Sequence, residues 1–166
     1  NKALMPNLLE FVNLGVLLHT DEVYDAKGNR LTPDRIKKIR DNIFALGNYR
    51  GEWLGNRFSQ TGEILVTSYY VVNKEGKLQL VTEPLDQDTL KKNSNIDLKS
   101  LLQNPTSQGL PRKDTKKGNL FYWSPLRDSV ARFVAYANWA GLVCDGDPVN
   151  TDASLGVREV RAKIFE

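Results

Sequence analysis

The sequence predicts an α+β fold in which two N-terminal helices precede an antiparallel β-sheet. Apolar residues recur at helical spacing up to about residue 47, whereas β-branched and aromatic residues form short runs after residue 63. Because helices and strands do not alternate along the chain, the βαβ pattern of dinucleotide-binding folds does not fit. The glycines also form no phosphate-cradling loop. The length of 166 residues suits one domain that spans residues 1–166.

Both helices have clear sequence signals. In residues 7–18 the apolar positions that share one helical face are Leu8, Leu9, Val12 and Val16. The second helix is expected to begin with Thr32 as its N-cap and Pro33 as its first residue, and to end near Gly47. Its apolar positions are Ile36, Ile39, Ile43, Phe44 and Leu46.

The rest of the chain is predicted to be mostly strands and connectors. Residues 50–54 are expected to be irregular, and residues 63–72 and 78–82 to form a hairpin around a glycine-containing turn at residues 73–77. Residues 86–102 are polar and compatible with a short helix, and residues 103–119 are expected to form a long surface connector. Residues 120–123 open a final β region, and residues 157–164 are expected to close the chain as a strand.

Within residues 133–145 two sets of side chains alternate. Successive side chains of a strand point to opposite faces, so each set is expected to occupy one face. The set predicted to be buried is small or apolar: Phe133, Ala135, Ala137, Ala140, Leu142 and Cys144. The set predicted to be exposed is chemically mixed: Val134, Tyr136, Asn138, Trp139, Gly141, Val143 and Asp145. A uniform face beneath a heterogeneous one is typical of a binding surface.

This alternation fits an antiparallel hairpin. With a two-residue turn at Asn138 and Trp139, Ala137 would face Ala140 and Tyr136 would face Gly141. A Trp at positive φ is strained in such a turn, so a wider loop fits equally well. A second alternative is a strand pair covered on both faces, in which Val134, Tyr136 and Val143 would also be buried.

The composition limits the chemistry that the chain can perform. Cys144 is the single cysteine and His19 the single histidine, so neither an internal disulfide nor Cys–His catalysis is expected. Cys144 is predicted to be a buried small hydrophobe and His19 a surface or capping residue. No set of nucleophile and base is visible, so the sequence predicts a protein that is not an enzyme and has no cofactor or metal.

Two alternatives come from the charged segments. Lysines and arginines gather in residues 91–117, which would suit a nucleic-acid-associated protein, but no aromatic residues lie between them. Residues 145–152 contain Asp145, Asp147 and Asp152, whose carboxylates are oxygen ligands of the kind that calcium binds. This segment lacks the glycine and glutamate spacing of an EF-hand loop, so a turn-rich loop is the more common explanation.

Several segments resemble a known family. The motifs are Phe121–Tyr122–Trp123–Ser124–Pro125, Ser129–Val130–Ala131–Arg132–Phe133 and Leu155–Gly156–Val157–Arg158–Glu159–Val160–Arg161, together with Arg50–Gly51–Glu52–Trp53–Leu54 and Gly109–Leu110–Pro111. They are similar to those of variable proteins of diversity-generating retroelements, of the archaeal or archaeal-virus type. The resemblance covers most of the chain from Met5 and is most specific after Leu120.

The resemblance implies a C-type-lectin-like fold and a C-terminal region, about residues 130–155, whose codons are mutated at adenines. Mutated Asn codons become NNC, which cannot encode Lys, Glu, Gln, Met or Trp. Trp139 departs from this restriction, and the other expected ligand-binding residues satisfy it. These expected residues are Val134, Tyr136, Asn138, Trp139, Gly141, Val143, Asp145, Asp147, Val149, Asn150 and Asp152.

The expected function is therefore non-enzymatic recognition of a receptor. The partner would be a protein or glycan on a host or neighbouring cell, with display on a virion or cell surface, and neither nucleic-acid binding nor membrane insertion is expected. Tyr136 and Trp139 would anchor the ligand. The calcium–sugar signatures of C-type lectins and the paired active-site cysteines of formylglycine-generating enzymes are both missing from the sequence.

Overall fold

The computed structural model describes residues 3–20, 22–25, 27–47, 50–150, 155–157 and 160–161. The helices are α1 (Leu8–Leu17), α2 (Pro33–Phe44) and α3 (Leu98–Gln103). The strands are β1 (Ala3–Leu4), β2 (Arg50–Thr61), β3 (Ile64–Val72), β4 (Leu78–Pro84), β5 (Ser94–Ile96), β6 (Leu120–Trp123), β7 (Ser129–Ala135), β8 (Ala140–Gly146), β9 (Leu155–Val157) and β10 (Val160–Arg161). The fold is α+β. Besides the two expected N-terminal helices it contains a third, short helix in the middle of the chain.

Both N-terminal helices begin where their capping residues predict. Asn7 caps α1 and forms a capping box with Glu10, in which each side chain accepts a hydrogen bond from the backbone N–H of the other residue. Thr32 caps α2, and Pro33 is its first residue. After α1, the Nδ1–H of the exposed His19 donates to the Gly15 carbonyl at 2.7 Å, which confirms His19 as a surface and capping residue.

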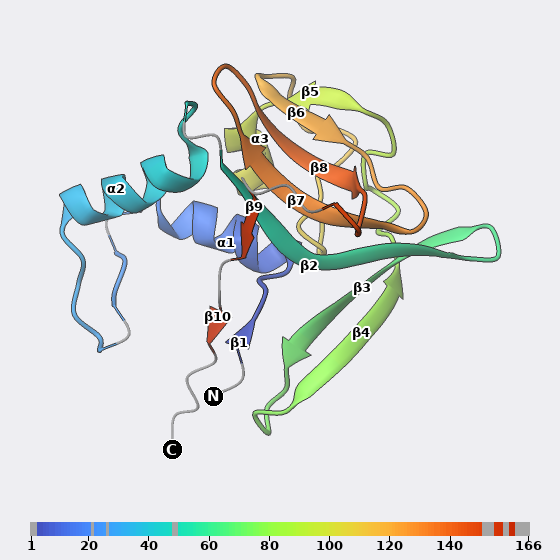
Figure 1. Cartoon of the computed structure of the whole chain (residues 1–166), viewed down its shortest axis with the longest axis horizontal. Coiled ribbons are helices and arrows are strands. Elements are labelled where there is room, and N and C mark those ends of the chain that lie inside the picture. The colour runs from blue at the N-terminus through green and yellow to red at the C-terminus, as the bar shows by residue number, and fades with distance from the viewer. Residues whose placement is uncertain are drawn as a thin grey trace.

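The main sheet is mixed, so the expectation of an antiparallel sheet is wrong. Its strand order is β4-β3-β2-β7-β8-β6-β5, and β9 also pairs with β2. The strand β8 lies between β6 and β7; it runs antiparallel to β7 and parallel to β6. The pairing of β9 with β2 is also parallel. The long hairpin of β3 and β4 projects away from the other strands (Figure 1).

The strand β2 crosses the middle of this sheet, and the expectation of irregular structure at residues 50–54 is wrong. Gly51 and Gly55 lower the strand propensity of this segment, but the sheet surrounds it. It pairs with β7 from Arg50 to Phe58, with β9 through residues 51–53 and with β3 through residues 57–61. Asn56, at 1% exposure, accepts a hydrogen bond from the N–H of Leu8 and donates one to Thr67. This buried amide joins the start of α1 to β2 and β3.

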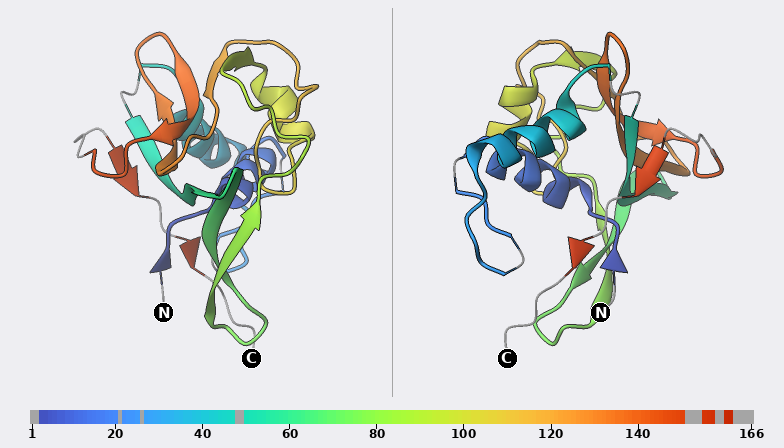
Figure 2. Two further views of the ribbon diagram at one scale, coloured as in Figure 1. Left: turned by 90° about the vertical axis from the view of Figure 1, so that its right-hand side faces the viewer. Right: turned by 60° about the vertical axis from the view of Figure 1, so that its left-hand side comes forward.

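The helices pack on one side of the sheet, and the core lies between these layers (Figure 2). Phe11 from α1, Phe44 from α2 and Phe133 from β7 form an aromatic cluster with ring centroids 5.2–5.8 Å apart. This layer therefore fixes the inner face of β7, and no helix formed by the described residues covers the opposite face of the sheet.

The connector between α3 and β6 is less exposed than the sequence predicts. Thr106, Gln108 and Leu110 are all buried, and the Cβ of any residue at position 109 would lie 2.5 Å from the backbone nitrogen of Leu9. Gly109 also has a φ of +80°. The connector therefore passes directly against the start of α1, which is why a glycine is required there.

The first and last described strands lie side by side, because β1 pairs antiparallel with β10 (Figure 1). The strand expected at residues 157–164 is instead two short strands: β9 pairs with β2, whereas β10 pairs with β1. Residues 158–159 and 162–164 of the expected strand lie outside the described residues.

Candidate functional site

The hairpin of β7 and β8 has a four-residue loop rather than a two-residue turn. Ala135 pairs with Ala140, and Val134 pairs with Gly141. The N–H of Tyr136 donates to the Trp139 carbonyl at 2.8 Å, and the N–H of Gly47 donates to the Tyr136 carbonyl at 2.7 Å. The wider loop avoids a Trp at positive φ. This register differs from the one expected for a two-residue turn by two residues, so each side chain keeps its predicted face.

The inner face of this hairpin is confirmed as buried framework. Phe133, Ala135, Leu142 and Cys144 have exposures between 0% and 2%. Burial also raises the pKa of the Cys144 thiol well above its ordinary value, so this cysteine is a core residue rather than a nucleophile. The prediction is wrong for Ala137, which lies exposed in the wider loop, and Ala140 at the loop edge is half-buried.

The outer face is more enclosed than expected. Val134 is 1% exposed and Val143 is 6% exposed, and Gly141 is also buried, so the expectation that these three residues are exposed is wrong. The reason is that neighbouring strands carry large side chains on the same face. Trp123 of β6 pairs with Val143, and Trp53 of β2 pairs with Arg132. Each side chain lies on the face that the sequence predicts, but the outer face is not as exposed as expected.

An aromatic cluster covers part of this outer face. Trp139 contacts Tyr136, Phe121 and Trp123, with ring centroids 4.7, 5.6 and 5.5 Å away. Phe121 and Trp123 stack on each other at 5.5 Å. Any Cβ at position 141 would lie 2.8 Å from the Trp123 ring and 3.1 Å from the Trp139 ring. The absence of a side chain at Gly141 therefore leaves room for both indole rings.

Beside this cluster lies an open concavity of about 470 Å³, within the usual size of small-molecule sites. Its lining residues are Arg132, Val134, Tyr136, Ala137, Asn138, Trp139 and Val143. Val134 and Val143 belong to the strands, and the wall from Tyr136 to Trp139 is the hairpin loop. Five of the expected ligand-binding residues therefore meet at one site, although the two valines are largely enclosed.

Two charged residues lie on this outer face. The guanidinium carbon of Arg132 lies 5.7 Å from the centroid of the Trp53 ring. Burial raises the pKa of Asp145 above its ordinary value, and the positive charge of Arg132 partly opposes this rise. Among the described residues the two side chains form no ion pair, and the buried Nε of Arg132 has no hydrogen-bond partner.

The remaining expected site residues follow β8. Asp147, Val149 and Asn150 are exposed, and Asp147 accepts a hydrogen bond from the N–H of Val149 at 3.0 Å, as in a turn in which Asp mimics the backbone. Asp152 lies outside the described residues. Within the described part of the chain, no three His, Cys, Asp or Glu side chains are arranged to hold a metal ion.

Three aromatic residues of this face are absent from the set that the sequence predicts: Trp53, Phe121 and Trp123. The sequence gives little sign of their face, because residues 120–123 are all large and hydrophobic. Phe121 is 38% exposed and Trp123 half-buried, whereas Leu120 and Tyr122 beside them are buried, so β6 alternates in the same way as β7. The pairing that brings these rings beside Trp139 joins distant segments, and local periodicity cannot reveal it.

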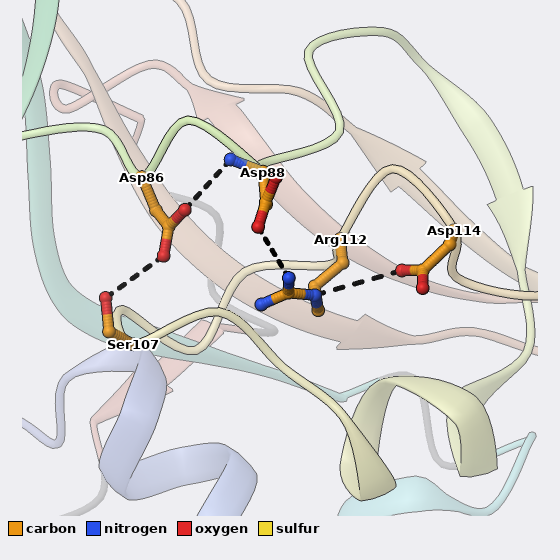
Figure 3. Close-up of polar contacts among 5 residues, drawn as sticks. All are labelled: Asp86, Asp88, Ser107, Arg112 and Asp114. Atoms are coloured by element: carbon orange, nitrogen blue, oxygen red, sulfur yellow. Dashed lines mark hydrogen bonds and ion pairs between the residues drawn. The ribbon is translucent and has the colours of Figure 1, made fainter.

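The basic segment of residues 91–117 is partly neutralised by acidic neighbours. Arg112 forms ion pairs with Asp88 at 2.5 Å and Asp114 at 3.8 Å (Figure 3). Asp86 accepts hydrogen bonds from the N–H of Asp88 and from the Ser107 hydroxyl, which ties the segment between β4 and β5 to the connector between α3 and β6. Arg112 therefore has a structural role in the connector. The exposed lysines nearby, such as Lys113 and Lys117, remain solvated.

No family model matches the sequence, and no curated protein or solved structure was found to be similar to it. Among the described residues there is no helix of the length and apolar character needed to cross a membrane.

Proposed function

We propose that this chain is a non-enzymatic ligand-binding protein of the C-type-lectin-like class, and that a diversity-generating retroelement diversifies its C-terminal surface. The single observation that carries the proposal is the two-sided hairpin of β7 and β8. Its inner face is packed against two helices, while its outer face and loop surround an open concavity. A rigid base beneath an open face limits the entropy lost on binding.

The structure leads us to propose a smaller ligand-contact set than the sequence does. The exposed loop and rim positions, which can change without disturbing the core, are Asn138, Asp147, Val149 and Asn150. Tyr136 and Trp139 are half-buried anchors, while Val134 and Val143 contribute the floor of the concavity. Gly141 belongs to the framework because side chains at this position would displace indole rings.

A pair of displayed libraries tests the proposal. The first library replaces Tyr136, Asn138, Asp147, Val149 and Asn150 with NNC-encoded residues, and the matched control replaces Phe133, Ala135, Leu142 and Cys144 in the same way. We expect the first library to retain folded variants and to yield specific binders to a panel of purified proteins. The control library should lose folded display. Equal loss of folded display in both libraries would contradict the proposal.

The coding region supplies an independent test of diversification. We expect a neighbouring reverse-transcriptase gene and a near-copy of the segment that encodes residues 129–152, differing from it at adenines. Differences concentrated at the codons of loop and rim positions would support the proposal. A near-copy with substitutions spread evenly over inner and outer positions would contradict it.

A further inference from the structure

We propose that the concavity binds a carboxylate of a protein partner, held by Arg132, with an apolar group of the partner beside it. This inference rests on the proposed binding function and deepens it, because it assigns a chemical class to the occupant. The partner group is a C-terminal carboxylate, or an Asp or Glu side chain, next to an apolar residue.

Arg132 is an enclosed cation at the edge of the concavity. Its side chain is half-buried and lines the concavity, and its Nε is fully enclosed. Within the described part of the chain, no acceptor reaches Nε and no carboxylate forms an ion pair with the guanidinium. Because no carboxylate of the described residues forms an ion pair with it, the guanidinium at the edge of the concavity can take an anion as its partner.

The protein also holds this cation in a defined place. The Arg132 side chain passes over Gly146, where an added Cβ would lie 3.6 Å from Nε and 3.7 Å from Cδ of the arginine. The guanidinium carbon lies 5.7 Å from the centroid of the Trp53 ring. A fixed planar guanidinium offers paired donors that match the two oxygens of a carboxylate.

Asp145 is an acidic neighbour of Arg132 on this face. The charge of Arg132 acts on the pKa of Asp145, yet the two side chains do not pair. The Asp145 carboxylate therefore weakens anion binding without occupying the donor positions of the guanidinium. Removal of that negative charge should strengthen the binding of an anionic ligand.

The walls of the concavity indicate what accompanies the carboxylate. Val134 and Val143 form an apolar floor, and Tyr136 and Trp139 add aromatic surface. Apolar floors favour an apolar side chain over the hydroxyl groups of a sugar. A volume of about 470 Å³ accommodates one capped amino-acid residue. An acidic peptide segment with an apolar neighbour therefore fits better than an acidic glycan.

The test uses the intact chain and three small probes: N-acetyl-L-leucine, its uncharged amide, and N-acetylneuraminic acid as an acidic sugar. Binding is followed by NMR through the indole N–H signals of Trp53, Trp123 and Trp139. We expect N-acetyl-L-leucine to cause saturable shifts at millimolar concentrations. The amide should bind at least about tenfold more weakly, as the loss of a charge-assisted hydrogen bond predicts. The acidic sugar should also bind more weakly than N-acetyl-L-leucine.

Two variants assign the effect to the guanidinium. Arg132→Gln should abolish the preference for the acid over the amide, and Asp145→Asn should strengthen binding of the acid. Asp145→Asn retains Arg132, so its result stands even if Arg132→Gln does not fold. Equal binding of acid and amide, or no strengthening in Asp145→Asn, would overturn the inference. Tighter binding of the acidic sugar would overturn the assignment to a protein partner.

These outcomes are separable from failure of the proposed function. The displayed libraries leave Arg132 unchanged and score recognition of any protein, so they can yield binders even when the probes show no preference for a carboxylate. Conversely, Arg132-dependent binding of N-acetyl-L-leucine with no binders from the libraries would count against diversification alone.

Discussion

Both faces of the β7–β8 hairpin are rich in buried apolar side chains, but they pack against different elements. On the inner face Phe133 packs against Phe11 and Phe44 of the helices. On the outer face Val134 and Val143 are almost as deeply buried, yet aromatic side chains of the sheet and loop cover them rather than a helix. Burial alone therefore does not distinguish a framework residue from a residue on the floor of the concavity.

The two faces differ in the elements that pack on them. The inner face packs against helices whose residues are distant in the sequence. Any change on this face therefore disturbs several elements at once. The outer cover includes Tyr136 and Trp139, which belong to a four-residue loop and border an open concavity. Changes in the outer cover are therefore expected to affect binding more than stability.

The largest expected effect is the loss of an inner-face ring. Phe133→Ala should lower the free energy of unfolding by about 3–5 kcal/mol, because it leaves a cavity between both helices and the sheet. Phe121→Ala on the outer face is the matched control, and at 38% exposure it should cost less than about 2 kcal/mol. Urea denaturation followed by circular dichroism measures both. Equal losses would show that the two covers are energetically equivalent.

The next-largest effect tests Gly141, whose lack of a side chain leaves room for two indole rings on the outer face. Gly141→Ala should lower the free energy of unfolding by about 1–3 kcal/mol, because the added Cβ would lie 2.8 Å from the Trp123 ring and force it to move. The indole N–H signals of Trp123 and Trp139 should shift in NMR spectra. Gly156→Ala is the control, since its Cβ would meet its nearest atom at 3.8 Å. A neutral Gly141→Ala would return position 141 to the variable set.

Features with local signals are predicted well from the sequence. Capping residues and spacing place α1 and α2, and alternation assigns each strand residue of the hairpin to the correct face. The pairing register expected for a two-residue turn differs from the observed register by two residues. An even shift of the register leaves each side chain on the same face of the sheet. Five of the expected site residues, among them Tyr136, Asn138 and Trp139, line one concavity.

Features that depend on distant pairing are not predicted. The strand β2 contains glycines and an asparagine, and its propensity is overridden by neighbours on both sides. The pairing of β6 with β8 brings Phe121 and Trp123 beside Trp139 and encloses Val143. No periodicity within residues 129–146 could reveal that a second aromatic strand would cover this face.

A smaller effect is expected for the loop aromatics. Replacement of both Tyr136 and Trp139 by Ala should lower the free energy of unfolding by only about 1–2 kcal/mol, because both rings are half-buried and border the concavity. The same variant should lose binding of N-acetyl-L-leucine and of library-derived partners. Thermal denaturation and the NMR titration are the two measurements. A loss as large as that of Phe133→Ala would place these rings in the core.

The smallest effect concerns the charge on the outer face. Burial raises the folded-state pKa of Asp145 above its unfolded value, so the contribution of this group to stability is greatest at low pH and declines as the pH rises through the folded-state pKa. Asp145→Asn should therefore stabilise the protein slightly at pH 7, within about 0.5 kcal/mol. The gain should vanish below about pH 3, where the carboxyl is protonated in both states.

Thermal melts of Asp145→Asn between pH 3 and 7 test this sign, with Glu63→Gln as a control for the removal of one exposed carboxylate. If Asp145→Asn instead destabilised the protein at neutral pH, the carboxylate would be a partner that Arg132 requires. The guanidinium would then belong to the framework, like the rings beneath it, and the outer face would lose the anion-binding group that separates it chemically from the inner one.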